Sequence, residues 1–470
     1  MPKGDIVKGV LVDKLIFGGN GLGRMPDGRK LVIAGGAVPG SVVSVRLLRA
    51  RASHAEGQVW EVEKPSPLER PIPAHWQVYG GCKWLPIPYE KQLEIKQQQV
   101  KEAFHHLKAE SADAVFHPIV ASPKTEGYRN KTEFSFGVYF SDAEGVRDRF
   151  RFGFHKQGEF SKVIDCSYCV LGDEETNAVF KEVDTFARAS GLPTYDPVRH
   201  NGFWRHLVVR RSHNLGGTMV VFSLKTDDEA AGPVKMAEFR AWASNLPKVL
   251  PHVTSVWMLH NMSQADIVDG DPELLAGERS LKEKVLGLTF EIHPRSFFQT
   301  NTLGAEKLYE TAASFIRQPG GVLLDLYAGT GTIGTVLSGK FDKVYSVELS
   351  ASASQDCRNN LELNGVHNVE PVNETVEDFC AAFTAKGGKA DTVVVDPPRS
   401  GMHPDAPVAI RNFGAKEIIY VSCNPATLAR DLKSLMEGGL YRLTDVAAVD
   451  MFPHTHHIET VVRLEAAGPR

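Results

Sequence analysis

The last third of the chain alternates short apolar strands with helical segments, and this alternation constrains the fold more than any other feature. From about residue 300 onward the strands read GVLLDLYA, KVYSVEL, DTVVVDPP and EIIYVSCNP. Repeats of strand, helix and strand build a parallel, doubly wound sheet with helices on both faces. Ligands bind beyond the carboxyl ends of the strands in such sheets, so the residues that follow each strand are the candidates for a functional site.

A glycine-rich loop, within DLYAGTGTIG, follows the first of these strands. Gly329, Gly331 and Gly334 match the pattern G-x-G-x-x-G. Glu348 ends the next strand about 20 residues later, where a carboxylate can bind ribose hydroxyls. A dinucleotide and S-adenosylmethionine both fit this arrangement. The carboxylate of Asp325, just before the loop, repels a pyrophosphate and suits a cationic amino-acid group, which favours S-adenosylmethionine. Taken alone, the glycine motif is also compatible with a tight turn that binds no ligand.

Three further candidates stand at later strand boundaries. Asp396 ends one strand before two prolines, and Cys423 ends the next, where a helix begins. A thiol at a helix N-terminus has a lowered pKa and is a better nucleophile, although most free cysteines are small buried residues. Glu459 begins the last β-branched run and can serve as a base. Without paired Cys/His spacing, a polar loop rather than a metal site is predicted for three histidines: His454, His456 and His457.

The first part of the chain predicts a small β-barrel. Residues 6–63 contain β-branched runs separated by glycine turns and no helical pattern. Residues 1–70 carry eleven basic and seven acidic side chains, whereas the whole chain has a net charge of −4. On charge alone, this local excess indicates a solvated face. The proline-rich segment KPSPLERPIP then marks a boundary.

The middle of the chain predicts a mixed α and β region. The stretch YEKQLEIKQQQVKEAFHHL is helical, with its apolar residues near one face: Leu93, Val100, Phe104 and Leu107. The segments NKTEFSFGVYF, RFRFGFHK, RHLVVRRS and GTMVVFSLK follow as strands. Their alternation predicts a sheet with one exposed face.

Length and composition set the outer limits. A chain of 470 residues predicts about three domains, which we place at residues 1–66, 74–290 and 291–470. No apolar run approaches the roughly 18 residues of a membrane span, and the N-terminus has no secretory pattern. The six cysteines therefore predict reduced thiols in a cytoplasmic protein, and we expect a monomer without membrane contact.

Five motifs together resemble the RNA (uracil-5-)-methyltransferase family: FFQTN (297–301), DLYAGTGTIG (325–334), DPPRSGM (396–402), VSCNPATLARD (421–431) and DMFPHTHHIE (450–459). The resemblance covers essentially the whole chain. It implies an α/β fold with a C-terminal Rossmann-like methyltransferase domain, a central α+β domain and an N-terminal TRAM barrel that binds RNA. Bacterial transfer-RNA enzymes of the family generally lack TRAM, so the chain is most similar to the 23S ribosomal RNA enzymes of the RlmD (RumA) type.

The resemblance also implies a role for individual residues. Cys423 matches the nucleophile, and Glu459 matches the base that removes the C5 proton. Phe297 matches an aromatic residue near the target base. Four residues match positions that contact S-adenosylmethionine: Gln299, Tyr327, Glu348 and Asp396.

The chemistry of uracil methylation requires such a pair. Uracil C5 is a weak nucleophile, and addition of the Cys423 thiolate at C6 makes C5 electron-rich enough to accept a methyl group. A base such as Glu459 must then remove the C5 proton so that the cysteine can leave. The uridine must be unstacked or flipped for this reaction, and Phe297 can stack on the extruded base.

One departure from the family concerns its iron–sulfur cluster, which many relatives hold on four cysteines. Here the corresponding segment reads HWQVYGGCKW, with Tyr79 where a cysteine is expected and Cys82 as its only thiol. Cys166 and Cys169 lie near the usual fourth ligand, and three thiols are too few for a Cys-only [4Fe–4S] site. His75 fits only an unusual arrangement. We therefore predict no cluster, with the remaining thiols close together.

Three alternatives stay open beside methylation of 23S ribosomal RNA. The same chemistry can act on the T-loop uridine of transfer RNA. Formation of 5-methylcytidine also uses cysteine addition, but the segment DPPRSG lacks the second cysteine typical of that family. An RNA-binding or folding factor with incidental methylation would keep its function when Cys423 is replaced by alanine. The target uridine is not encoded in any linear motif.

Overall fold

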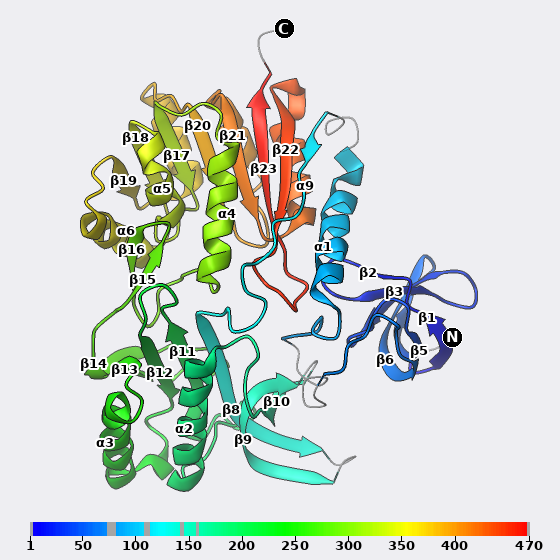
Figure 1. Ribbon diagram of the computed structural model, residues 1–470, viewed down its shortest axis with the longest axis vertical. Coiled ribbons are helices and arrows are strands. Elements are labelled where there is room, and N and C mark those ends of the chain that lie inside the picture. Colours follow the sequence, from blue (N-terminus) through cyan, green and yellow to red (C-terminus); the bar gives the residue numbers. More distant parts are fainter. Residues whose placement is uncertain (1–2, 73–80, 108–112, 142–144, 157–158, 468–470) are drawn as a thin grey trace.

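The computed structural model describes residues 3–72, 81–107, 113–141, 145–156 and 159–467. It contains three large sheets, one in each predicted region, as Figure 1 shows. The mixed α/β architecture and the Rossmann-like C-terminal region predicted from the sequence are confirmed. Within the described part of the chain, no helix is long and apolar enough to cross a lipid bilayer.

The N-terminal sheet curls into a small barrel around an apolar interior that includes Val7, Leu31 and Val45. Glycines keep its strands close, since a Cβ at Gly57 would lie 2.4 Å from the Val45 side chain. In spatial order its six strands are β1 (Ile6–Leu11), β5 (Val42–Ala50), β6 (His54–Lys64), β4 (Lys30–Ala34), β3 (Gly21–Arg24) and β2 (Lys14–Leu15).

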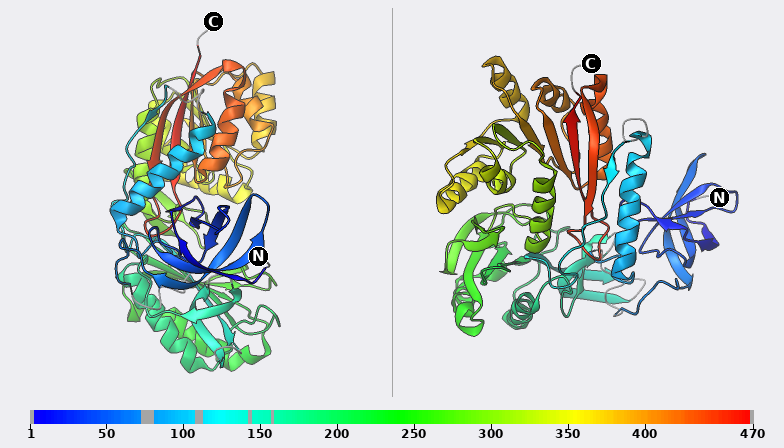
Figure 2. Two further views of the ribbon diagram at one scale, coloured as in Figure 1. Left: turned by 90° about the vertical axis from the view of Figure 1, so that its right-hand side faces the viewer. Right: turned by 45° about the horizontal axis from the view of Figure 1, so that its top comes forward.

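The barrel lies at one side of the molecule, beside helix α1 (Tyr89–Ala103), in Figure 1 and in the right-hand view of Figure 2. Gln99 of this helix donates from Nε2 to the Leu15 carbonyl at 3.0 Å, and Lys14 forms a 2.8 Å ion pair with Glu102. Helix α1 thus attaches the barrel to the rest of the protein.

The central sheet has seven strands and two covering helices, α2 (Glu174–Ser190) and α3 (Pro233–Val249). Aromatic side chains, among them Phe152, Phe180 and Trp204, fill the space beneath the helices. Its strands, in spatial order, are β10 (Glu159–Asp165), β9 (Val146–Lys156), β8 (Lys131–Ser141), β11 (Trp204–Arg211), β12 (Thr218–Leu224), β13 (Val253–His260) and β14 (Asp271–Gly277).

The prediction of one exposed face is wrong for β11 and β12, because every residue of these strands is buried. Val208, Met219 and Val221 on the second face join a cluster that continues into the C-terminal region. The hairpin β15 (Leu281–Val285) and β16 (Leu288–Ile292) supplies the opposing side chains of this cluster. The second face is therefore an interface between two parts of the chain.

The C-terminal sheet has eight strands. Five neighbouring strands are parallel to one another, and β23 enters antiparallel beside β21. The order is β19 (Val369–Val372), β18 (Lys343–Val347), β17 (Val322–Leu326), β20 (Thr392–Val395), β21 (Glu417–Ser422), β23 (Glu459–Ala466), β22 (Tyr441–Val449) and β7 (Val115–Phe116). Helix α1 and strand β7 come from the predicted central segment but pack against this sheet. The domain boundaries given above stay predictions.

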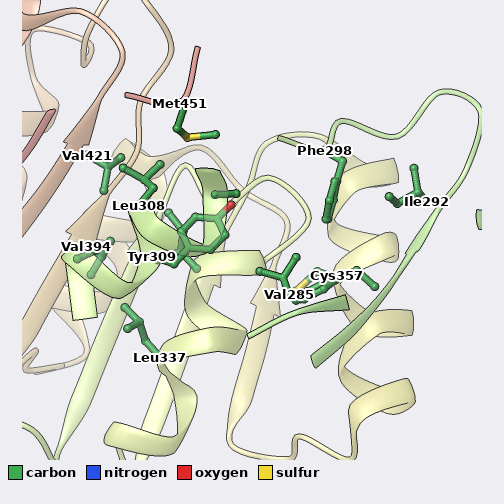
Figure 3. Close-up of a cluster of buried hydrophobic side chains, with 14 of the residues drawn as sticks. Val285, Ile292, Phe298, Leu308, Tyr309, Leu337, Cys357, Val394, Val421 and Met451 are labelled. Atoms are coloured by element: carbon green, nitrogen blue, oxygen red, sulfur yellow. The ribbon is translucent and has the colours of Figure 1, made fainter. Parts of the chain in front are cut away.

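Alternate residues of each strand pack on opposite faces of the C-terminal sheet, as strand geometry requires. Val394 and Val421 meet α4 (Thr302–Phe315) and its neighbours on one face, where Figure 3 shows them beside Tyr309 and Met451. The α5 (Thr332–Leu337) and α6 (Ala351–Asn364) helices share this face. The other face is covered by α1, α7 (Val376–Ala385), α8 (Ala406–Asn412) and α9 (Pro425–Leu435).

Candidate active site

A cavity of about 1310 Å³ opens at the carboxyl ends of β17, β18, β20 and β21. It is larger than the roughly 300–1,000 Å³ of pockets for single small ligands, so it has room for a cofactor and an extruded base together. All seven predicted site residues line it: Phe297, Gln299, Tyr327, Glu348, Asp396, Cys423 and Glu459. The structure therefore brings together side chains that are up to 162 positions apart in the sequence.

The glycine loop between β17 and α5 forms one wall of the cavity. Tyr327, Gly329 and Gly331 all have positive φ angles, of 61°, 56° and 72°. A Cβ at Gly331 would lie 2.2 Å from Sγ of Cys357, whereas one at Gly329 would meet nothing within 4 Å. The turn thus needs glycine at 331 for packing on α6, while Gly329 leaves open space where a ligand can approach the backbone.

Asp325 does not line the cavity, which differs from the expectation that it would face a cationic group. Its side chain is fully buried beneath the loop, where Oδ2 accepts from Gly334 N at 3.0 Å and from Ser346 Oγ at 3.1 Å. Burial raises the pKa of this carboxyl to about 7. Asp325 therefore supports the loop from below, and a strand-end position alone did not reveal on which side of the backbone it lies.

Glu348 supports the same loop from the neighbouring strand end. Its Oε2 accepts from Gly329 N at 2.9 Å, and its Oε1 accepts from Ser350 N at 2.8 Å. Each carboxylate oxygen can accept a second hydrogen bond, and the side chain faces the cavity. This arrangement suits a ligand with vicinal hydroxyls, such as a ribose.

Tyr327 and Asp396 complete the wall near the glycine loop. The Tyr327 side chain lines the cavity, while its hydroxyl oxygen is buried. Asp396 follows β20 directly, and burial, reinforced by Asp325, raises the pKa of its carboxyl to about 7. The donors and acceptors expected for S-adenosylmethionine are thus present.

Cys423 and Glu459 approach each other because β21 and β23 are antiparallel. Their register pairs Ser422 with Thr460, so Cys423 and Glu459 come next beyond the last pair, and both line the cavity. Glu459 is only 5% exposed, and burial, together with Asp396, raises the pKa of its carboxyl well above the usual range. A raised pKa makes the ionised form a stronger base.

The expectation of a lowered pKa for Cys423 is wrong in the ligand-free protein. Burial, and then the neighbouring carboxylate of Glu459, raise the pKa of this thiol to about 11. Arg399 opposes this rise, and Asp396 adds to it. These effects outweigh the favourable N-terminus of α9, so the resting cavity holds a protonated thiol.

The FFQTN segment forms another part of the cavity wall. Phe297 is 69% exposed and lies in the cavity wall, whereas Phe298 is buried in the core beside it. Asn130 of the central region donates from Nδ2 to the Gln299 carbonyl at 2.8 Å. Asn301 caps α4 by accepting from Gly304 N at 2.9 Å. An exposed aromatic ring on an anchored backbone is suited to stacking on a base.

The three histidines lie in the loop that leads into Glu459, and only His457 among them lines the cavity. Burial lowers the pKa of His454 and His456 to about 4 and that of His457 to about 3. All three are therefore neutral at pH 7. Among the described residues no group of three or more His, Cys, Asp or Glu side chains is arranged to hold a metal ion.

The cysteines of the central region lie in one apolar cluster, as Cys82, Cys166 and Cys169 all pack there. Burial, and then the neighbouring Cys169, raise the pKa of Cys82 to about 12. Tyr79 and His75, on which the argument against an iron–sulfur cluster also rests, lie outside the described residues. The absence of a cluster stays a prediction.

Sequence reasoning missed the basic side chains of the cavity. Arg129, from the turn before β8, lines it together with Arg295 and Arg399. Their positive charge suits a polyanionic substrate. Arg399 stands in the motif DPPRSGM, to which no role for the arginine was assigned. Arg129 precedes an ordinary strand, so no local signal connects it to residues 200 or more positions away.

Comparisons with known proteins agree with this geometry. A family model described as tRNA (Uracil-5-)-methyltransferase matches residues 271–467. An uncharacterized RNA methyltransferase of Porphyromonas gingivalis is 36% identical, over 95% of this chain and 97% of its own. One from Caldanaerobacter subterraneus is 37% identical, over 99% and 100%.

A solved structure is similar over nearly the whole chain. It is the Pyrococcus abyssi tRNA (uracil-54, C5)-methyltransferase in complex with S-adenosyl-L-homocysteine. The TM-score is 0.74 at 26% identity, covering 97% of this chain and 100% of that one. The likeness therefore extends over all three sheets, beyond the segment that the family model matches.

Proposed function

The chain belongs to the RNA (uracil-5-)-methyltransferase family, as an S-adenosylmethionine-dependent enzyme, and from this premise we propose that it forms 5-methyluridine in 23S ribosomal RNA. We assign the covalent chemistry to Cys423 and Glu459. The observation that carries this assignment is their position beyond one antiparallel strand pair, in a cavity that also contains the glycine loop.

The proposed reaction begins with the thiol. Cys423 gives its proton to solvent, and Sγ bonds to uracil C6 while the C5–C6 electron pair moves toward the C4 carbonyl. When bound, S-adenosylmethionine supplies the electrophilic methyl group that C5 receives. An ionised Glu459 then takes the C5 proton, the C5–C6 double bond re-forms, and the C6–S bond breaks to release Cys423. Splitting the reaction in this way replaces one difficult step by easier ones.

The charges around the pair fit this sequence of steps. Arg399 lowers the pKa of both Cys423 and Glu459, so it favours the thiolate needed first and the carboxylate needed last. The negative charge of Glu459 makes ionisation of Cys423 more costly, and a thiolate at Cys423 makes ionisation of Glu459 more costly in turn. We therefore expect one of the two to be protonated at a time.

We assign the contacts with the cofactor to residues that line the cavity wall. We propose that Glu348 accepts from the ribose hydroxyls and that Tyr327 contacts the same cofactor, as do Asp396 and Gln299. The place of Tyr327 in the cavity wall and the open space at Gly329 support this placement. Phe297, exposed in the same cavity, is proposed to stack on the flipped uridine.

The RNA substrate is the less constrained part of the proposal. The TRAM-like barrel at residues 6–63 favours 23S ribosomal RNA, because bacterial transfer-RNA enzymes of the family generally lack such a barrel. Transfer RNA is the second candidate, because the similar Pyrococcus abyssi enzyme methylates uracil-54 of transfer RNA.

The deciding experiment incubates purified protein with S-adenosylmethionine and, separately, unmodified 23S ribosomal RNA and unmodified transfer RNA. Digestion to nucleosides then quantifies 5-methyluridine. Product from ribosomal RNA alone is expected. Product from transfer RNA alone would keep the mechanism and overturn the proposed substrate, and product from neither would overturn the proposed function.

A further inference from the structure

Helix α1 carries a row of polar side chains on its buried face, where apolar residues are normal. Gln92, Lys96 and Gln99 are spaced by four and three positions, which places them on one side of the helix. Gln92 and Lys96 are completely buried, and Gln99 is almost so. Burying such groups is costly unless each finds a partner. The partners therefore show what this face of the helix is for.

Gln92 holds the residue His454 by both ends of its amide. Its Oε1 accepts from the His454 backbone N at 2.7 Å, and its Nε2 lies 2.9 Å from His454 Nδ1. His454 has a φ of 65°, an uncommon conformation for a residue with a Cβ. The Trp84 backbone N donates to the His454 carbonyl at 3.0 Å. Contacts from elsewhere in the chain thus hold this strained turn.

Lys96 holds the same loop one turn further along α1. Its Nζ lies 2.6 Å from Oδ1 of Asp450, with both side chains fully buried, and donates to the Phe452 carbonyl at 3.1 Å. A buried ion pair of this kind contributes registry more reliably than stability. It defines how the loop sits on the helix.

The loop in question, residues 450–458, connects β22 to β23 and runs directly into Glu459. Phe452 and His457 of the loop also line the cavity. Two further side chains from outside hold its backbone: Asn301 donates to the Met451 carbonyl at 2.8 Å, and Tyr128 donates to the Pro453 carbonyl at 3.0 Å.

Cys423 is held by different contacts. It precedes α9, where Asn424 accepts from Ala426 N and donates to the Arg399 carbonyl, both at 3.1 Å. None of these contacts involves Gln92 or Lys96. A disturbance of the α1 contacts should therefore displace Glu459 more than Cys423.

We propose that Gln92 and Lys96 are positioning residues that hold the 450–458 loop, and through it Glu459, in the geometry for removing the C5 proton. This inference rests on the proposed function. In the step concerned, Glu459 takes the C5 proton, the C5–H electrons form the C5–C6 double bond, and the C6–S electrons return to Cys423. If Glu459 is misplaced, addition and methylation proceed while release stalls.

The experiment compares wild type with Gln92→Leu, which removes both contacts with His454 and also the bonds from Nε2 to the Trp84 and Ile87 carbonyls. A matched control is Gln98→Leu on the exposed side of the same helix. Each protein is incubated with S-adenosylmethionine carrying a labelled methyl group and with the RNA that wild type methylates. The readouts are labelled protein–RNA adduct that survives denaturing electrophoresis, and free RNA containing 5-methyluridine.

For Gln92→Leu we expect release of methylated RNA to slow about 10-fold or more, consistent with an impaired general base. Labelled adduct accumulates, while methyl incorporation in the first turnover and KM for RNA stay within about 3-fold of wild type. The control behaves as wild type. A double variant, Lys96→Met with Asp450→Asn, removes the ion pair without leaving a lone buried charge. We expect it to show the same slow release of methylated RNA with near-normal methyl incorporation. It replaces Gln92→Leu if that protein does not fold.

Other outcomes overturn the inference. Release at the wild-type rate would show that the α1 contacts do not position Glu459. Incorporation and release falling in parallel, without adduct, would show a general structural role only. Wild-type protein that methylates neither ribosomal nor transfer RNA would instead overturn the proposed function, so the two failures are distinguishable.

Discussion

Replacing Asp325 by asparagine removes a charge that the protein buries completely under its glycine loop. Oδ2 of Asp325 accepts two hydrogen bonds, and Oδ1 has no partner among the described residues. Burial raises the pKa of the carboxyl from 3.8 to about 7. A shift of one pKa unit is equivalent to roughly 1.36 kcal/mol, so this pKa shift corresponds to about 4 kcal/mol of free energy against the ionised form in the folded protein.

The sign follows from proton linkage. The pKa of Asp325 is higher in the folded protein than in the unfolded chain, so between these two values the folded state binds more protons. The free energy of unfolding therefore falls as the pH rises through this window. About 3 of the 4 kcal/mol is lost between pH 5 and pH 8.5. Asparagine has no charge to bury, and its carbonyl oxygen can still accept from Gly334 N.

The assay is unfolding of the ligand-free proteins at pH 5 and pH 8.5. From pH 5 to pH 8.5, the free energy of unfolding of Asp325→Asn should rise by about 3 kcal/mol relative to that of wild type. For a domain of roughly 150–250 residues this corresponds to a relative rise of roughly 6–12 °C in the thermal midpoint. The control Asp378→Asn removes an exposed carboxylate of α7 and should show no such gain. A stability difference between Asp325→Asn and wild type that is the same at both pH values would refute the reasoning.

Three further predictions test other parts of the site. Gly331→Ala should abolish S-adenosylmethionine binding in calorimetry, because its Cβ would collide with Sγ of Cys357 at a positive φ, whereas Gly339→Ala, with open space around it, should bind normally. Alkylation of Cys423 by iodoacetamide in the ligand-free protein should rise about 10-fold per pH unit from pH 7 to pH 10, since the pKa of the thiol is about 11; a plateau near pH 8 would contradict the raised pKa. Protein purified without oxygen should contain no iron or sulfide, because only three cysteines are available in the central region, and stoichiometric iron would contradict this.

Several residues of the candidate site could be found from the sequence because they directly follow predicted strands. In a parallel sheet the residues after the strands meet at one edge, so Glu348, Asp396 and Cys423 were found from local pattern alone. Glu459 was noted at the start of the last β-branched run, and the family resemblance implied its role as the base. The antiparallel entry of β23 then places it beyond the same strand pair as Cys423.

Other features depend on contacts that local sequence does not encode. The helix containing Gln92 and Lys96 was predicted, with Leu93, Val100, Phe104 and Leu107 near one face, of which Leu93 is half-buried and the other three, two of them in the 3-10 turn after α1, are buried. Its polar row was not, because the partners Asp450 and His454 lie more than 350 positions away. The raised pKa of the thiol and the covered second face of the central sheet likewise arise only when distant segments pack together.

The central claim is that Cys423 forms a covalent bond to uracil C6, and RNA containing 5-fluorouridine tests it most directly. A C5 fluorine cannot be removed as a proton, so the methylated adduct should persist and mass spectrometry should find the nucleotide on the peptide that carries Cys423. The Cys423→Ala protein should form neither this adduct nor 5-methyluridine in ordinary RNA. Methylation of ordinary RNA by Cys423→Ala, or an adduct on another residue, would contradict the account.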